Sequence, residues 1–130
     1  MAAADTNVLL RLLLDDDEQQ GRAARAFQRT HAPLFVSHIV LAELGWVLVS
    51  AYGFSRERLG ALLEMLVDTE GITLQEPTVV RAALASFRAS RADFSDCLIL
   101  AVAQSAATVP LATFDRKLGR LPGTRRIGPR

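Results

Sequence analysis

The sequence is poor in cysteine and has no long apolar run. Its 130 residues include one cysteine, Cys97, so no internal disulfide can form, which argues against a disulfide-stabilised secreted domain. No apolar run approaches the about 20 residues that a membrane-spanning helix requires. The first residues also lack the basic segment and apolar core of a signal peptide. Together these absences predict a soluble, cytoplasmic protein without a membrane span.

Lysine is nearly absent, and the charges almost balance. Lys117 is the one lysine, and the formal net charge is +1. The strong positive field of a very basic nucleic-acid-binding protein is therefore not expected. The cations gather instead near the C-terminus, at Arg116, Lys117, Arg120, Arg125, Arg126 and Arg130. This cluster either binds phosphate oxygens or is a solvated basic tail.

The chain length fits one domain, residues 1–130, with enough surface to bury for a stable core. Short apolar runs alternate with stretches of helical periodicity, which is typical of βα units around a parallel sheet and predicts the α/β class. The expected strands are residues 2–5, 33–36, 72–74, 110–112 and 125–127. The expected helices are residues 8–14, 15–30, 38–53, 59–67, 77–87 and 93–107. Ser37 is the expected N-cap of the third helix. The fourth helix is expected to turn one apolar stripe to the core, made of Leu59, Leu62, Leu63, Leu66 and Val67.

Some polar residues are better explained by structure than by chemistry. Cys97 lies within the apolar run CLILAVA with no neighbouring histidine, so it is expected to be a buried hydrophobic side chain rather than a nucleophile. His31 falls in a loop and His38 at a helix start, and neither is interpreted as a metal ligand. The nucleophiles and ligands must therefore be sought among the acids.

Glu43 stands in the middle of the apolar stretch SHIVLAELGWVLV. A buried carboxylate without a partner costs several kcal/mol, so a glutamate held there requires a cation, a metal ion or a site open to solvent. A salt bridge to an arginine within the core is the alternative explanation.

Further acids are expected near strand ends and at a helix start. Asp5 closes the first expected strand and Asp115 follows the fourth, and the carboxyl ends of parallel strands form the crevice where ligands bind. Asp93 and Asp96 are three residues apart at a helix start, so they share one side of it. Each of these acids also fits the role of a helix cap, which serves the fold alone.

The acids taken together are stronger evidence for a metal site than any one of them alone. A right-handed parallel arrangement brings the ends of the first and fourth strands to the same edge. Two carboxylates about 4 Å apart repel by roughly 4 kcal/mol at an effective dielectric near 20, so a cluster is tolerable mainly around divalent cations. Ligands that are all oxygen favour Mg²⁺ or Mn²⁺ over zinc.

Four blocks follow one another along the chain: ADTNVLLRLLL, VSHIVLAELGWVL, ADFSDCLILAVA and LATFDRKL. In this order they resemble the PIN-domain family, particularly the VapC-type toxins of bacterial toxin-antitoxin pairs, over nearly the whole chain. The resemblance implies a PIN-like α/β/α sandwich with a central, mostly parallel sheet of four to five short strands. One departure is visible, because the first strand reads MAAAD where family members place bulkier aliphatic residues. That strand is expected to pack weakly.

The resemblance also implies an endoribonuclease site built from acids that bind Mg²⁺ or Mn²⁺, with no covalent intermediate. The residues that match the family's acidic positions are Asp5, Glu43, Asp96 and Asp115, with Asp93 as a further acid nearby. Asn7 and Thr113 match polar positions that support the site by hydrogen bonds. An RNA substrate, a cognate VapB-type antitoxin and a homodimer are implied as well, with Trp46, Val49 and Tyr52 as either dimer face or core.

Two other functions remain open at this point. A phosphotransfer enzyme with Asp5 as aspartyl nucleophile requires a second acid soon after it and a lysine at a later strand end, whereas position 7 is asparagine and Lys117 is the one lysine. A PIN-like binding module that has lost catalysis is the second alternative, and the presence of all four matched acids argues against it.

Overall fold

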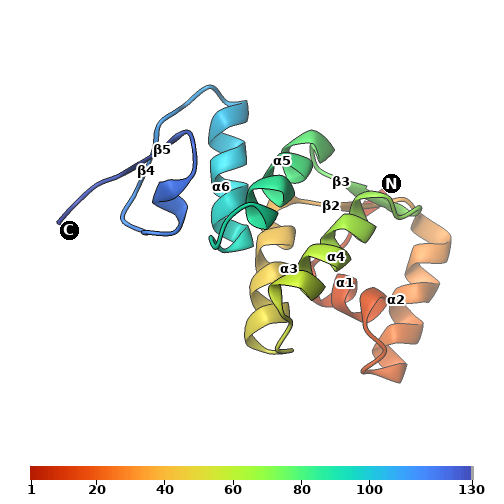
Figure 1. Ribbon diagram of the computed structural model, residues 1–130. Helices are drawn as coiled ribbons and strands as arrows, with labels where there is room; N and C mark the ends of the chain where they lie inside the picture. The colour runs from red at the N-terminus through yellow and green to blue at the C-terminus, as the bar shows by residue number, and fades with distance from the viewer. Residues whose placement is uncertain (130) are drawn as a thin grey trace.

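The computed structural model describes residues 1–129, as six α-helices and five short strands. The strands are β1 (Ala2–Ala3), β2 (Leu34–Val36), β3 (Ile72–Leu74), β4 (Leu111–Thr113) and β5 (Thr124–Arg126). The helices are α1 (Thr6–Leu13), α2 (Glu18–His31), α3 (His38–Ser50), α4 (Arg56–Val67), α5 (Pro77–Arg88) and α6 (Phe94–Ser105), with a 3₁₀ turn η1 at Leu118–Arg120. Every element expected from the sequence is present, with ends that differ by a few residues (Figure 1).

Side-chain caps fix where several helices begin. The Ser37 hydroxyl accepts a hydrogen bond from the backbone N–H of Val40 at the start of α3. Asp5 does the same for α1 and Ser55 for α4. Each cap satisfies a backbone donor that the helix itself leaves without a partner, which explains the predicted cap at Ser37.

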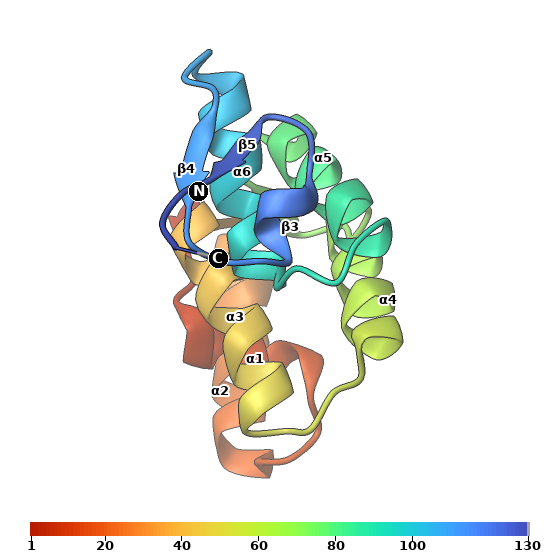
Figure 2. The ribbon, with the colours of Figure 1, turned by 60° about the vertical axis from the view of Figure 1, so that its left-hand side comes forward.

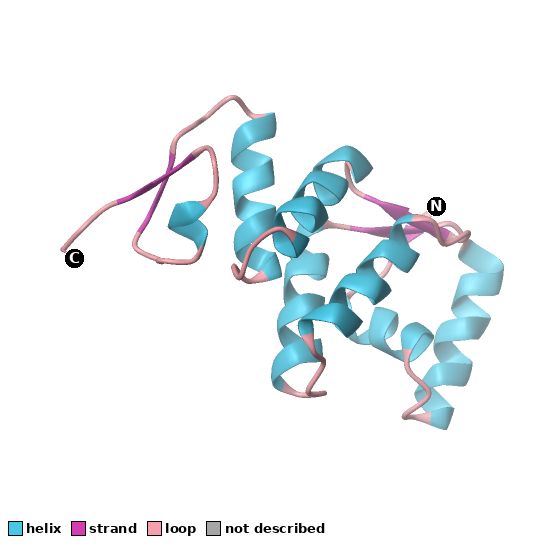
Figure 3. Cartoon of the chain, in the orientation of Figure 1, coloured by secondary structure: helices cyan, strands magenta, loops and turns pink. Residues whose placement is uncertain are grey.

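A three-stranded parallel sheet lies among the helices, with β2 between β1 and β3 (Figure 3). The architecture is the expected PIN-like α/β/α type. Leu34 pairs with Ile72 and Val36 with Leu74, whereas β1 contributes only the pairs from Ala2 and Ala3. The alanine-rich first strand is the shortest one, and alanine is less common in strands than β-branched residues.

The fourth and fifth strands correct the expectation of one central sheet. β4 pairs in parallel with β5, and the two form a separate two-stranded sheet. This pair lies on the far side of α6 from the three-stranded sheet, and Figure 2 shows it running beside α6. The ends of β1 and β4 therefore do not share one sheet edge, contrary to the sequence-based argument.

The packing of the C-terminal segment explains this division. Leu118 is buried, and Leu111 and Leu121 pack as partly buried side chains against the main core. Because hydrophobic stabilisation scales with the apolar area buried, these contacts favour the observed position of the segment.

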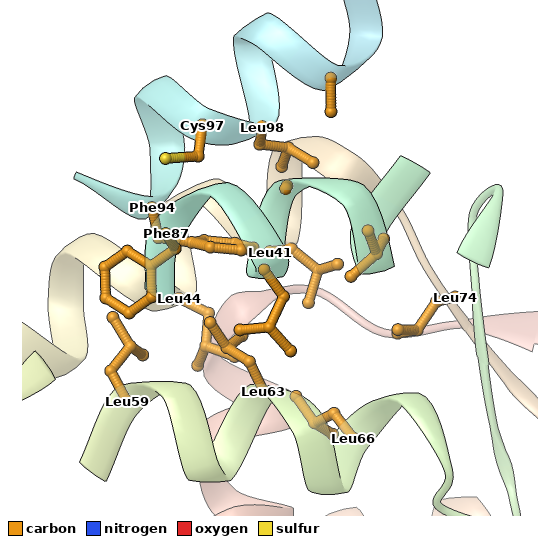
Figure 4. Close-up of a cluster of buried hydrophobic side chains, with 14 of the residues drawn as sticks. Leu41, Leu44, Leu59, Leu63, Leu66, Leu74, Phe87, Phe94, Cys97 and Leu98 are labelled. Carbon is orange, nitrogen blue, oxygen red and sulfur yellow. The ribbon is translucent and has the colours of Figure 1, made fainter. Parts of the chain in front are cut away.

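The core is built mainly from α3, α4, α5 and α6 (Figure 4). The expected apolar stripe of α4 faces the core, since Leu59, Leu63 and Leu66 are buried. The other two members of the stripe, Leu62 and Val67, are partly buried against the same core. Gly45 on α3 allows a close approach to α6, because a Cβ there would stand 3.3 Å from the Phe94 ring. This contact fixes the start of α6 against α3. Within residues 1–129, no helix combines the length and the apolar content that crossing a membrane requires.

Candidate functional site

Three acids, called the α6 acids below, lie near one another where α6 begins: Asp93, Asp96 and Asp115. Asp93 occupies the N-cap position, but its side chain makes no capping hydrogen bond, so its carboxylate is free for another role. Asp96 lies in the first turn of α6 and is half-buried. Burial raises the pKa of Asp96, and the negative charges of Asp93 and Asp115 raise it further. Burial and the two neighbouring charges therefore disfavour the ionised form of Asp96.

Asp115 belongs to the turn after β4, and Thr113 supports it. The backbone N–H of Asp115 donates to the Thr113 hydroxyl at 3.0 Å. One oxygen of the Asp115 carboxylate accepts from the N–H of Leu118 at 2.7 Å. This hydrogen bond caps the η1 turn and holds the carboxylate on the side where its charge acts on Asp96. Thr113 therefore contacts Asp115 through this hydrogen bond, and its supporting role in a site stays a prediction.

Arg56 fixes the loop that leads into α6. One of its terminal nitrogens donates to the carbonyl oxygens of Phe87 at 2.7 Å and of Ser90 at 3.0 Å. The other donates to the carbonyl of Ala92 at 3.0 Å, directly before Asp93. The guanidinium also lies over the Phe87 ring, 4.0 Å from its centroid. The sequence showed no motif around Arg56, because its partners are backbone carbonyls some thirty residues away.

We expect Arg56→Ala to lower the free energy of unfolding by about 2–4 kcal/mol, because several carbonyls lose a charged donor. Chemical denaturation of the purified variant measures this loss. Arg58→Ala is the matched control, because Arg58 also lies 4.0 Å over a ring, that of Phe54, but its side chain forms none of these hydrogen bonds. Equal losses in both variants would contradict the role given to the carbonyl hydrogen bonds.

Asp5 lies apart from the acids of α6. It caps α1 by accepting from the N–H of Val8 at 3.0 Å. Its side chain lines a cavity of about 590 Å³ formed by the first two helices and β1. The lining includes Asn7, Arg11, Gln20 and Phe27, and none of the other matched acids. The roles of Asp5 and Asn7 in a catalytic site therefore remain predictions based on their motif. The structure shows Asp5 as the N-cap of α1.

Glu43 is exposed, although the sequence places it within an apolar stretch. The reason is that α3 is apolar on both faces. Leu41, Leu44 and Leu48 are buried, whereas Ile39 and Trp46 are exposed beside Glu43. Among residues 1–129, Glu43 forms no ion pair, so the alternative of a salt bridge within the core is wrong. The carboxylate is open to solvent and free to act in a site.

A second cavity, the Trp46 cavity, adjoins the α6 acids and measures about 440 Å³. Five segments of the chain converge on it. Its lining residues are Gly45, Trp46, Val49, Ser50, Phe54, Arg56, Leu59, Phe87, Arg91, Asp93, Phe94, Ser95 and Lys117. The sequence did not reveal this cavity, because its walls come from positions more than seventy residues apart.

The donor chemistry of the α6 acids fits a divalent ion such as Mg²⁺ or Mn²⁺. The ligands available are carboxylate oxygens, and burial together with their mutual repulsion raises the pKa of Asp96. Binding of a cation relieves that repulsion. In the part of the chain described, residues 1–129, no three acidic, histidine or cysteine side chains form a ready metal-binding group. The fit therefore rests on the charge and type of the donors.

The remaining sequence-based interpretations concern the cysteine, the two histidines and the C-terminal cations. Cys97 is buried as expected, and burial raises the pKa of its thiol. His38 forms hydrogen bonds with Gln75, and His31 stacks on the ring of Phe27. Among the C-terminal cations, those from Arg116 to Arg126 are exposed, and Arg130 lies outside the described residues.

Comparison with known proteins agrees with the resemblance seen in the sequence. The family model described as the PIN domain matches residues 2–123. A VapC ribonuclease from Aquifex aeolicus (strain VF5) is 25% identical over 132 residues, which cover 99% of this chain and 97% of that protein. No solved structure gives a significant match. Because the family model spans nearly the whole sequence, this chain belongs to the PIN-domain family.

Proposed function

We propose that the protein is a metal-dependent endoribonuclease and the toxin of a toxin-antitoxin pair. The observation that carries the proposal is the group of acids at the start of α6, in which Asp93 and Asp115 act on Asp96. The match to the PIN domain and the similarity to a VapC ribonuclease support the assignment to nucleases. The cytoplasm, where RNA is accessible, is the proposed location.

We propose Mg²⁺ or Mn²⁺ as the cofactor. Such an ion, when bound, lowers the pKa of a water molecule and neutralises charge on phosphate oxygens. Asp96 and Asp115, with Asp93 nearby, would supply carboxylate oxygens to it. Asp5 and Glu43 complete the proposed catalytic set on the basis of their motifs, and Glu43 has the solvent access that this role requires. Asn7 is proposed to support Asp5.

The proposed substrate is single-stranded or looped RNA, whose unpaired bases are accessible to protein side chains. Arginines near the acids would hold the phosphate backbone. We further propose a cognate VapB-type antitoxin and a homodimer as partners, on the grounds of family membership and similarity to a VapC ribonuclease.

A metal titration with RNA tests the proposed function. The wild-type chain should cleave single-stranded RNA in Mn²⁺ or Mg²⁺, and EDTA should abolish cleavage because the carboxylates alone do not activate water. The Asp5→Asn variant should lose activity under the same conditions. Equal residual cleavage by the wild type and the variant would indicate a contaminating nuclease, and the proposal would fail.

The wild-type and Asp5→Asn proteins also test the two alternative functions, an aspartyl-phosphate enzyme and a binding module without catalysis. A stable adduct with a phosphate mimic in Mg²⁺, lost in Asp5→Asn, would support an aspartyl-phosphate enzyme in place of a nuclease. RNA binding without cleavage in either metal would support a binding module that has lost catalysis. Mapped cleavage ends in cellular RNA after brief expression would then identify the target of an active enzyme.

A further inference from the structure

We propose that the Trp46 cavity is a nucleotide subsite for single-stranded RNA, in which the base stacks on Trp46 while Arg91 and Lys117 bind a neighbouring phosphate. The inference rests on the proposed function and adds the place where the substrate is held. It concerns residues that carry no role in the argument for cleavage.

The size and position of the cavity suit one nucleotide beside the acids. A volume of about 440 Å³ lies in the range of pockets that hold small ligands. Asp93 lines the cavity and also acts electrostatically on Asp96. A nucleotide bound here would therefore place an adjoining phosphodiester next to the acids of α6.

Trp46 lines this cavity with an exposed aromatic side chain. Its side chain is 68% exposed, although α3 buries its opposite face in the core. Phe54, Phe87 and Phe94, which also line the cavity, are buried and already packed. A large exposed indole at a cavity is suited to stacking on a base, and stacking tolerates any base because each has a π-face.

The charges of the cavity favour a phosphate. Its lining contains Arg56, Arg91, Lys117 and one acid, Asp93. Arg56 donates to backbone carbonyls, whereas within residues 1–129 neither Arg91 nor Lys117 forms an ion pair. Two free cations from separate segments, the loop before α6 and the turn after β4, thus face one cavity. They are suited to a single phosphodiester backbone passing between them.

Intrinsic fluorescence tests the stacking directly, because Trp46 is the only tryptophan in the chain. The Asp5→Asn chain, in which cleavage is expected to be lost, is titrated in Mg²⁺ with an unlabelled single-stranded RNA of twelve nucleotides. Quenching of the tryptophan emission is the expected result. An RNA of the same length held in a duplex should quench less, because its bases are already stacked. Binding without any change in emission would overturn the assignment of Trp46.

Variants then measure the contribution of each side chain, using anisotropy of the same RNA with a fluorescein label. We expect Trp46→Leu to raise Kd by about tenfold and Trp46→Phe by less, since phenylalanine keeps a smaller stacking surface. Arg91→Ala and Lys117→Ala should each weaken binding and reduce its salt dependence. Arg29→Ala is the matched control, because Arg29 is an exposed residue of α2 that lines neither the Trp46 cavity nor the cavity at Asp5.

The outcomes separate this inference from the proposed function. Cleavage by the wild type together with unchanged Kd in the cavity variants would overturn the subsite and leave the nuclease proposal standing. Binding that depends on Trp46 without cleavage in any metal would support the subsite and contradict the nuclease. A change from dimer to monomer in Trp46→Leu, seen by light scattering, would place Trp46 in a subunit interface and overturn its role with RNA.

Discussion

Asp96→Asn should lower the kcat/KM of RNA cleavage by at least about 100-fold while leaving the fold intact. Loss of a residue that merely supports a metal ligand typically costs 10- to 100-fold, so loss of a proposed direct ligand should cost more. Asparagine keeps the size of the side chain and removes the charge that binds the cation. Cleavage of labelled RNA in saturating Mn²⁺ measures the effect.

The same substitution should raise the thermal midpoint of the metal-free protein. Burial and two neighbouring negative charges raise the pKa of Asp96 above the ordinary 3.8. When folding raises the pKa of a carboxyl group, the group stabilises the fold fully at pH values below its pKa in the unfolded state. That contribution is lost as the pH rises through its pKa in the folded state. At neutral pH the charged side chain therefore destabilises the fold. The neutral asparagine removes the buried charge and its repulsion by Asp93 and Asp115.

Thermal unfolding at pH 7 in EDTA tests the expected rise in the thermal midpoint of Asp96→Asn. Asp15→Asn is the control, because Asp15 is an exposed acid outside this group and should change neither stability nor cleavage. A thermal midpoint that falls in Asp96→Asn would contradict the picture of an anion held in a repulsive site. An increase in stability together with loss of activity would support a site whose charge serves function at the expense of the fold.

Leu44→Ala should lower the free energy of unfolding by about 3 kcal/mol and the thermal midpoint by roughly 10 °C. Leu44 is fully buried among the helices of the main core, so the shorter side chain leaves a cavity there. Denaturant titration and calorimetry of the purified variant measure both quantities.

The neighbouring residue provides the matched comparison. Glu43 precedes Leu44 on α3 but is exposed. Glu43→Ala should therefore leave the thermal midpoint almost unchanged and reduce RNA cleavage, the reverse of the core variant. A large loss of stability in Glu43→Ala would show that this side chain serves the fold and would remove it from the proposed catalytic set.

The order and type of the elements could be predicted from the sequence because they depend on local patterns. The leucine spacing of residues 59–67 and the cap at Ser37 are both found as expected. The exposure of Glu43 could not be predicted, since α3 is apolar around its whole circumference and periodicity gives no single buried face. Arg56 and the Trp46 cavity also escaped prediction, because their contacts join segments remote in the sequence.

By itself, the sequence determined the α/β class, the membership of the PIN-domain family and the identities of the candidate acids, because these follow from local periodicity and ordered motifs. Only the tertiary structure decided which acids lie together. It placed Asp93 and Asp115 where they act on Asp96, while β4 paired with β5 beside α6 instead of with the alanines of β1. Burial of apolar surface between distant segments decides that pairing, and no local pattern of residues encodes it.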